Sequence, residues 1–111
     1  MPNKIDKVLK QFIAQVSELI GNRLKKVILY GSYARGDYEK NSDIDLMILT
    51  DFNDEELVKY RMQIRDITCD LEAETDIVIS PLVRNIEKYN NRINVIPFYM
   101  NVQKEGVILL G

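Results

Sequence analysis

The N-terminal stretch from Ile5 to Ile20 has the hydrophobic spacing of an amphipathic helix. Its apolar residues recur at steps of three and four, which places their side chains on one face of a helix. They are Ile5, Val8, Leu9, Phe12, Ile13, Val16, Leu19 and Ile20. We therefore expect a first helix that buries this face in the core and ends near Gly21-Asn22.

Three short runs further along the chain are typical of buried strands. They span residues 27–30, 44–49 and 75–80 and are rich in Ile, Leu and Val. The first run stops at Gly31, so a turn or a helix is expected to begin at Gly31-Ser32. Pro81, which has no backbone N–H, is expected to close the third run.

A long helix is predicted between the second and third runs. Asn53 is followed three residues later by Glu56, which is the form of a capping box at a helix start. Helical spacing of apolar residues then continues, so the pattern predicts a helix over 54–72. The periodicity weakens over 82–94, where no clear element is indicated.

The C-terminal end predicts one more helix and one more strand. Pro97 is suited to the first turn of a helix that runs through Lys104, and Gly106 to its end. Residues 107–110 are apolar and predict a fourth strand. The alternation of helices and strands indicates one α/β (α+β) domain over 1–111, with a small mixed sheet of about four strands flanked by helices.

Composition narrows the classes of function. Hydrophobic residues make up 46% and charged residues 29%, the net charge is -2, and histidine is absent. We expect a cytoplasmic protein without a membrane segment, and the charge does not favour nucleic-acid binding. A single cysteine excludes an internal disulfide, and Cys69 is expected to be a buried apolar residue. Catalysis would depend on carboxylates, hydroxyls, basic side chains and metal.

Asp43 and Asp45 are the acidic residues that most need an explanation. Residues two apart on a strand point to the same face, so their carboxylates can share a cation. Mg²⁺ prefers such oxygen ligands and commonly completes its coordination with substrate phosphates. Asp76, at the start of another predicted strand, could supply a third carboxylate. This set fits a two-metal site with ions roughly 3.5–4 Å apart.

Gly31 and Ser32 are candidates for contact with a phosphate. They stand where a strand gives way to a helix, so backbone N–H groups and the Ser32 hydroxyl can meet an anion there. Arg35, one turn later, could reach phosphate oxygens or could pair with Asp37 or another acid, and the sequence does not separate these uses.

These residues resemble the signature of the DNA polymerase beta-type nucleotidyltransferases. Gly31-Ser32, then ten residues, then Asp43-Ile44-Asp45 match it, and the segments 31–36 and 42–46 look like the minimal nucleotidyltransferase branch. The resemblance extends to Glu105-Gly106 and so covers nearly the whole chain. It implies the polymerase beta-type nucleotidyltransferase fold.

The resemblance also implies roles for individual residues. Gly31 and Ser32 would hold the triphosphate of ATP, Asp43 and Asp45 would bind Mg²⁺, and Asp76 would be the third metal-binding acid, which helps to activate the acceptor hydroxyl. Arg35 and Ser42 complete the implied nucleotide-binding set.

Minimal members of this family are often encoded beside a HEPN-domain ribonuclease toxin and act as antitoxins that transfer AMP from ATP to it. The implied partners are therefore a nucleoside triphosphate and a HEPN-domain toxin, with a tyrosine as acceptor. The chain could work within a homo- or hetero-oligomer.

Two other interpretations of the same residues fail, and two stay open. A calcium loop over Asn41, Asp43 and Asp45 fails because Leu46 and Phe52 replace the required glycine and glutamate. A Walker loop fails because no Gly-Lys-Ser or Gly-Lys-Thr follows Gly31. A non-catalytic antitoxin that only covers its toxin, and nucleotidyl transfer to a small molecule such as an aminoglycoside, stay open as alternatives.

Overall fold

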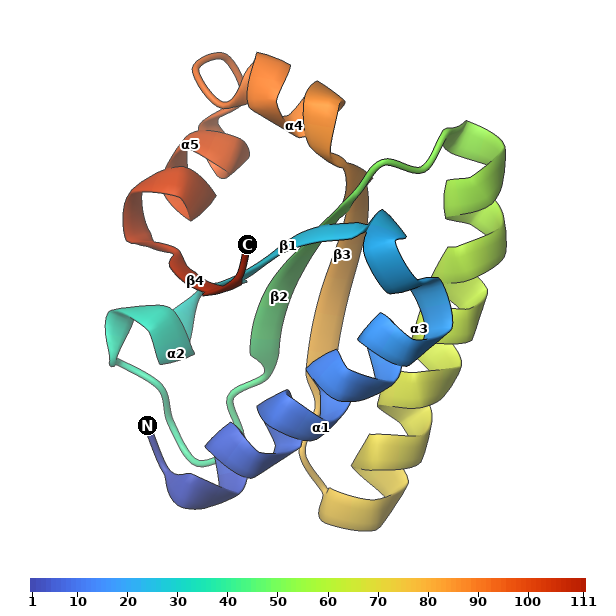
Figure 1. Cartoon of the computed structure of the whole chain (residues 1–111). Helices are drawn as coiled ribbons and strands as arrows, with labels where there is room; N and C mark the ends of the chain where they lie inside the picture. The colour runs from blue at the N-terminus through green and yellow to red at the C-terminus, as the bar shows by residue number, and fades with distance from the viewer.

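The computed structural model describes all 111 residues, which form one layered α/β arrangement (Figure 1). The elements in chain order are α1 (Asn3–Ile20), a 3₁₀ turn η1 (Gly21–Arg23), β1 (Leu24–Tyr30), α2 (Ser32–Arg35), β2 (Ile44–Thr50), α3 (Asp54–Thr75), β3 (Ile79–Asn85), α4 (Ile86–Arg92), α5 (Pro97–Glu105) and β4 (Val107–Leu110). None of the helices is both long enough and apolar enough to cross a membrane.

The four strands form one mixed sheet in the order β3-β2-β1-β4. β1 is antiparallel to both β2 and β4, whereas β2 and β3 are parallel and are joined by α3. Parallel neighbours need such a crossover, because a tight turn cannot connect them. The predicted fold class, a small mixed sheet flanked by helices, is confirmed.

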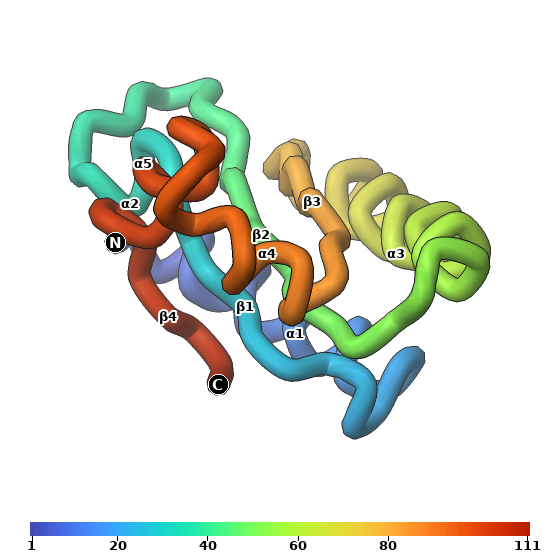
Figure 2. The backbone as a smooth tube through the Cα atoms, turned by 90° about the horizontal axis from the view of Figure 1, so that it is seen from above, coloured from blue at the N-terminus to red at the C-terminus, as the bar shows by residue number.

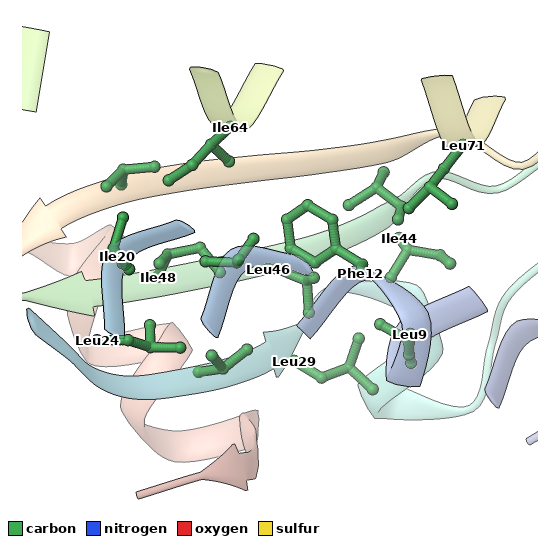
Figure 3. Packing of buried hydrophobic residues seen from close by; sticks show 14 of the residues in the cluster. Leu9, Phe12, Ile20, Leu24, Leu29, Ile44, Leu46, Ile48, Ile64 and Leu71 are labelled. Carbon is green, nitrogen blue, oxygen red and sulfur yellow. The ribbon is translucent and has the colours of Figure 1, made fainter. Parts of the chain in front are cut away.

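One face of the sheet is covered by α1 and α3 and carries the larger core (Figure 3). The apolar stripe of α1, including Leu9 and Phe12, packs on Leu29 and Leu46 of the two central strands, and Ile64 approaches from α3. Phe12 is fully buried. The spacing that predicted α1 therefore identified the side chains that hold it on the sheet.

The opposite face carries a smaller core under α4 and α5 (Figure 2). Met47 and Leu49 of β2 pack there against Tyr89 of α4 and Val102 of α5. The Tyr89 hydroxyl donates a hydrogen bond of 3.2 Å to Gln103, which ties the two helices together. This cover is short, so one end of the face remains open.

The capping box at the start of α3 is present as predicted. The Asn53 side chain accepts from the Glu56 N–H at 2.9 Å, and the Glu56 carboxylate accepts from the Asn53 N–H at 3.1 Å. Cys69 is exposed on α3, so its predicted burial was wrong. The core-facing residues of this helix include Thr68 and Leu71, and Cys69 falls outside their stripe.

The third strand differs from its prediction in both bounds. α3 continues to Thr75, Asp76 ends it in a left-handed conformation, and β3 begins only at Ile79. Pro81 lies inside β3 instead of closing it. β3 is an edge strand, where a residue without an N–H is tolerated if that group would have faced away from the sheet. The region of weak periodicity consequently begins as strand, and α4 starts at Ile86.

Candidate active site

Asp45 is the second residue of β2 and lies on the sheet face that α4 and α5 cover. Side chains alternate along a strand, and Met47 and Leu49, two and four residues on, belong to the core of that face. Its partners in register are Tyr30 on β1 and Ser80 on β3. A half-buried carboxylate therefore stands in the middle of the sheet, beyond the end of the apolar core.

Asp43 lies just before β2 and is exposed, and its negative charge affects the pKa of Asp45. Burial raises the pKa of Asp45 above its ordinary value, the Asp43 charge raises it further, and Arg35 opposes both effects. On the other side, the Ser80 hydroxyl lies 3.5 Å from an Asp43 carboxylate oxygen and donates to it. The two carboxylates thus form a crowded pair that a cation would stabilise.

The turn at Gly31 brings the end of β1 directly onto this pair. Gly31 has φ 77° and ψ -156°, a conformation almost restricted to glycine. A Cβ at this position would overlap the Asp45 carboxylate. The chain then enters α2, whose N–H groups at Ala34 and Arg35 donate to the Gly31 carbonyl at 3.1 and 3.0 Å. Glycine is therefore required both for the turn and for the close approach to Asp45.

A hollow of about 440 Å³ opens beside these residues, between the β1–α2 turn and α5. It is lined by Tyr30, Gly31, Ser32, Arg35, Asp45, Phe98, Asn101, Val102 and Glu105. Four of the residues predicted from the sequence, Gly31, Ser32, Arg35 and Asp45, thus share one hollow, with Asp43 two residues from Asp45.

Tyr30 forms an apolar wall of the hollow with its hydroxyl kept neutral. Its ring meets that of Phe98 edge-on, with centroids 5.5 Å apart. Burial raises the pKa of Tyr30 to about 12, with a further contribution from Asp45 and an opposing one from Arg84. The Tyr30 hydroxyl therefore adds no negative charge next to the carboxylate pair.

Arg35 is held at the rim of the hollow by two acids. Its guanidinium donates to Asp37 at 3.2 Å and to Glu105 at 3.3 Å, and these contacts raise the pKa of Arg35. The sequence had left open whether Arg35 pairs with acids or meets a phosphate. The structure shows the pairing and also places the guanidinium at the hollow.

Asp76 and Ser42 do not line this hollow, so the structure does not bring the three predicted aspartates into one cluster. Nowhere in the chain do three His, Cys, Asp or Glu side chains lie close enough together to hold a metal ion among themselves. Asp76 is exposed and shares a separate hollow with Ser42, and the Ser42 hydroxyl accepts from the Glu39 N–H at 2.7 Å. The reason is the late start of β3, which places Ser80, not Asp76, opposite Asp45.

Ser80 and Glu105 are site residues that the sequence analysis missed. Ser80 takes its place through the register of β3, which no pattern in the sequence defines. Glu105 is 70 residues from Arg35 in the chain, so only the packing of α5 reveals the contact. The match of Glu105-Gly106 to the family pattern was the single available signal.

Comparison with known proteins identifies the family. Residues 9–102 match the model of the nucleotidyltransferase domain. The chain belongs to this family. The nucleotidyltransferase domain is an enzyme domain, so the predicted family and enzyme class are both confirmed.

This nucleotidyltransferase domain also has similar relatives and solved structures. A candidate protein adenylyltransferase of Methanocaldococcus jannaschii is 36% identical over 104 residues, 94% of this chain and 96% of the relative. A candidate nucleotidyltransferase of Sulfolobus solfataricus aligns with a TM-score of 0.60 at 24% identity, covering 95% of this chain and 80% of that one. A toxin-antitoxin crystallised with AMP-PNP aligns with a TM-score of 0.58 at 18% identity, covering 99% of this chain and 74% of that one. The structural likenesses show the fold.

Proposed function

We propose that this nucleotidyltransferase transfers AMP from Mg²⁺-ATP to a hydroxyl of a partner protein. The observation that carries the proposal is the hollow in which Asp45 lies against the Gly31-Ser32 turn, with Asp43 beside it. The relative that is 36% identical across nearly the whole chain is named as a protein adenylyltransferase, which supports a protein as acceptor.

The residues present fit Mg²⁺ in combination with a nucleotide. Asp43 and Asp45 offer two carboxylates, and burial together with the charge of Asp43 raises the pKa of Asp45. Mg²⁺ is commonly held by one or two carboxylates while phosphates and water supply the other ligands. We therefore assign the metal to Asp43 and Asp45 without Asp76. When bound, Mg²⁺ would neutralise charge that develops on the phosphate oxygens.

The chain's own residues would bind and orient the triphosphate. Backbone N–H groups at the start of a helix lack intrahelical partners, so the Gly31-Ser32 turn can donate to phosphate oxygens. Arg35 adds positive charge at the rim. An acceptor hydroxyl would attack the α-phosphorus, forming a new O–P bond as the bond to pyrophosphate breaks, and its proton would pass to water.

The acceptor we propose is a tyrosine of a HEPN-domain toxin, for which this chain would be the antitoxin. A toxin-antitoxin shares the fold, and its structure contains the ATP analogue AMP-PNP. Modification of the toxin would then block its activity. This assignment rests on the family resemblance and on that shared fold.

Mass spectrometry of the toxin tests this function. A HEPN-domain toxin encoded beside this protein, incubated with it and Mg²⁺-ATP, is expected to gain AMP-sized increments on a tyrosine, and none with Asp43→Ala. An unmodified toxin would contradict the proposal. Full rescue of cells by Asp43→Ala would instead indicate a toxin-binding protein, and AMP increments on an aminoglycoside would indicate a small-molecule acceptor.

Glu105→Gln is expected to weaken ATP binding more than it slows the chemical step. Glu105 holds Arg35 across the hollow, so it acts as a positioning residue for the guanidinium. Partly exposed ion pairs contribute about 0.2–1 kcal/mol, which corresponds to a rise in KM of up to about fivefold with little change in kcat. Steady-state kinetics measure both, with Glu18→Gln, an exposed acid of α1 without an ion pair, as the control. A fall in kcat as large as the rise in KM would exclude a positioning role.

A further inference from the structure

A second hollow, of about 340 Å³, runs along the outer edge of the sheet between α3 and β3. We call it the arginine groove, because Arg61 and Arg65 of α3 and Arg84 of β3 line it. Its apolar lining includes Pro81 and Leu82, which are partly exposed, beside the buried Ile64 and Ile79. The groove thus combines an apolar floor with three cationic side chains.

The edge of β3 is closed to pairing with another strand. The Val83 carbonyl points away from the sheet, since it accepts from Arg61 at 3.2 and 2.9 Å and from Arg84 at 3.0 Å. Pro81, two residues earlier, faces the same way along the strand and has no N–H to offer. A segment that enters the groove would therefore be recognised by side chains and not by backbone pairing.

The three guanidinium groups have no acidic partner in the protein. Seven ion pairs join other residues, and none includes Arg61, Arg65 or Arg84. The chain as a whole has a net charge of -2, so this groove is a local positive region on an acidic protein. The Arg65 guanidinium makes no hydrogen bond within the protein. Arg61 and Arg84 each use only some of their five N–H donors.

We infer that the arginine groove binds an acidic, partly apolar segment of the protein that accepts AMP. Carboxylates of the segment would meet the three guanidinium groups, and its apolar side chains would pack on Pro81 and Leu82, which are partly exposed. Nucleic acid fits less well, because it would leave the apolar floor without a partner and would meet a chain of net negative charge.

The groove and the site of transfer share the edge strand β3 but lie on opposite faces of the sheet, since Ile64 and Ile79 belong to the core under α1 and α3. Ile79 lines the groove, and the next residue, Ser80, donates to Asp43. Because β3 is the edge strand, a segment that passes round it beside Ser80 could bring its hydroxyl to the carboxylate pair while its acidic residues remain on Arg61, Arg65 and Arg84. The inference rests on the proposed function in one respect, since it names the acceptor side of the same site.

A labelled peptide tests the groove. The probe alternates glutamate with leucine and ends in one tyrosine, and its fluorescence anisotropy is followed as the full-length protein is added. We expect the doubly substituted Arg65→Gln, Arg84→Gln protein to bind it about tenfold more weakly or worse. Arg92→Gln, which removes an exposed arginine of α4, is the matched control and should bind like the unsubstituted protein.

Two outcomes would overturn the inference: equal binding by the double variant, or equal binding of a probe with glutamine in place of glutamate. The same samples separate this inference from the proposed function. AMP transfer to the toxin without binding of the acidic probe would refute the groove alone. Binding of the probe that requires Arg65 and Arg84, without AMP transfer to any protein, would refute the transferase proposal alone.

Discussion

Asp45→Asn is expected to slow nucleotidyl transfer severely and, in the absence of metal, to make the fold more resistant to heat at neutral pH. The loss of activity follows because the amide is a poor ligand for Mg²⁺ and leaves charge on the phosphates unopposed. Metal assistance contributes several kcal/mol to such reactions, so the rate should fall on the order of a thousandfold. Transfer of labelled AMP measures the rate.

The gain in stability has a separate physical cause. Burial and the Asp43 charge raise the pKa of Asp45 in the folded protein, so the ionised form opposes folding. Its favourable contribution is present at acidic pH, below the pKa of the unfolded chain, and is lost as pH rises through the folded pKa. Asparagine cannot ionise, so the increase in Tm over the unsubstituted protein should be greatest at neutral pH and shrink in acid.

The control for this experiment is thermal unfolding with EDTA present at both pH values. An inactive Asp45→Asn protein with an unchanged or lower Tm at neutral pH would show that repulsion between the carboxylates does not destabilise the fold. An active variant would remove Asp45 from the site.

Gly31→Ala is expected to damage both the fold and the active site. The backbone conformation at Gly31 costs other residues about 1–3 kcal/mol, and the added methyl group would displace the Asp45 carboxylate. We expect the free energy of unfolding to fall by at least this amount, and AMP transfer to be lost even at temperatures where the variant is folded. Urea denaturation and the transfer assay measure the two effects.

The Gly36→Ala variant distinguishes the effect of backbone strain from the effect of a steric clash with Asp45. Gly36 also has a positive φ, of 87°, but a Cβ there would meet no atom within 4 Å. A non-glycine residue in this left-handed conformation costs about 1–2 kcal/mol, so stability should fall while activity per folded molecule is retained. If Gly36→Ala were as inactive as Gly31→Ala, the clash with Asp45 could not be the cause of inactivity.

Local patterns predicted most of the fold. The stripe of α1, the capping box of α3 and the Pro97 start of α5 are features of neighbouring residues, and the structure has each of them. The strand β2 and its acids were also found, because an aspartate two residues from another within an apolar run is unusual. These predictions needed no knowledge of which strands pair.

The third acid could not be predicted in the same way. Asp76 precedes an apolar run and resembled the first residue of a strand, but α3 extends three residues beyond its predicted end and takes Asp76 as its cap. A shift of a few residues in a strand start changes which side chain lies opposite Asp45. The register of β3 depends on the pairing of the whole sheet, so the position of Ser80 opposite Asp45 could be identified only from the structure.

The position in the chain of the residues proposed to bind the nucleotide has a consequence for folding. Gly31, Ser32 and Asp43 lie in the connection between the adjacent antiparallel strands β1 and β2, and Asp45 follows within β2, so a single local loop closure brings them together at little cost in entropy. Pairing of β1 with β2 through this loop should be faster than pairing of β1 with β4, because β4 is much further away in the sequence. We therefore expect the phosphate side of the site to assemble early, and the α5 wall with Glu105 to be completed last.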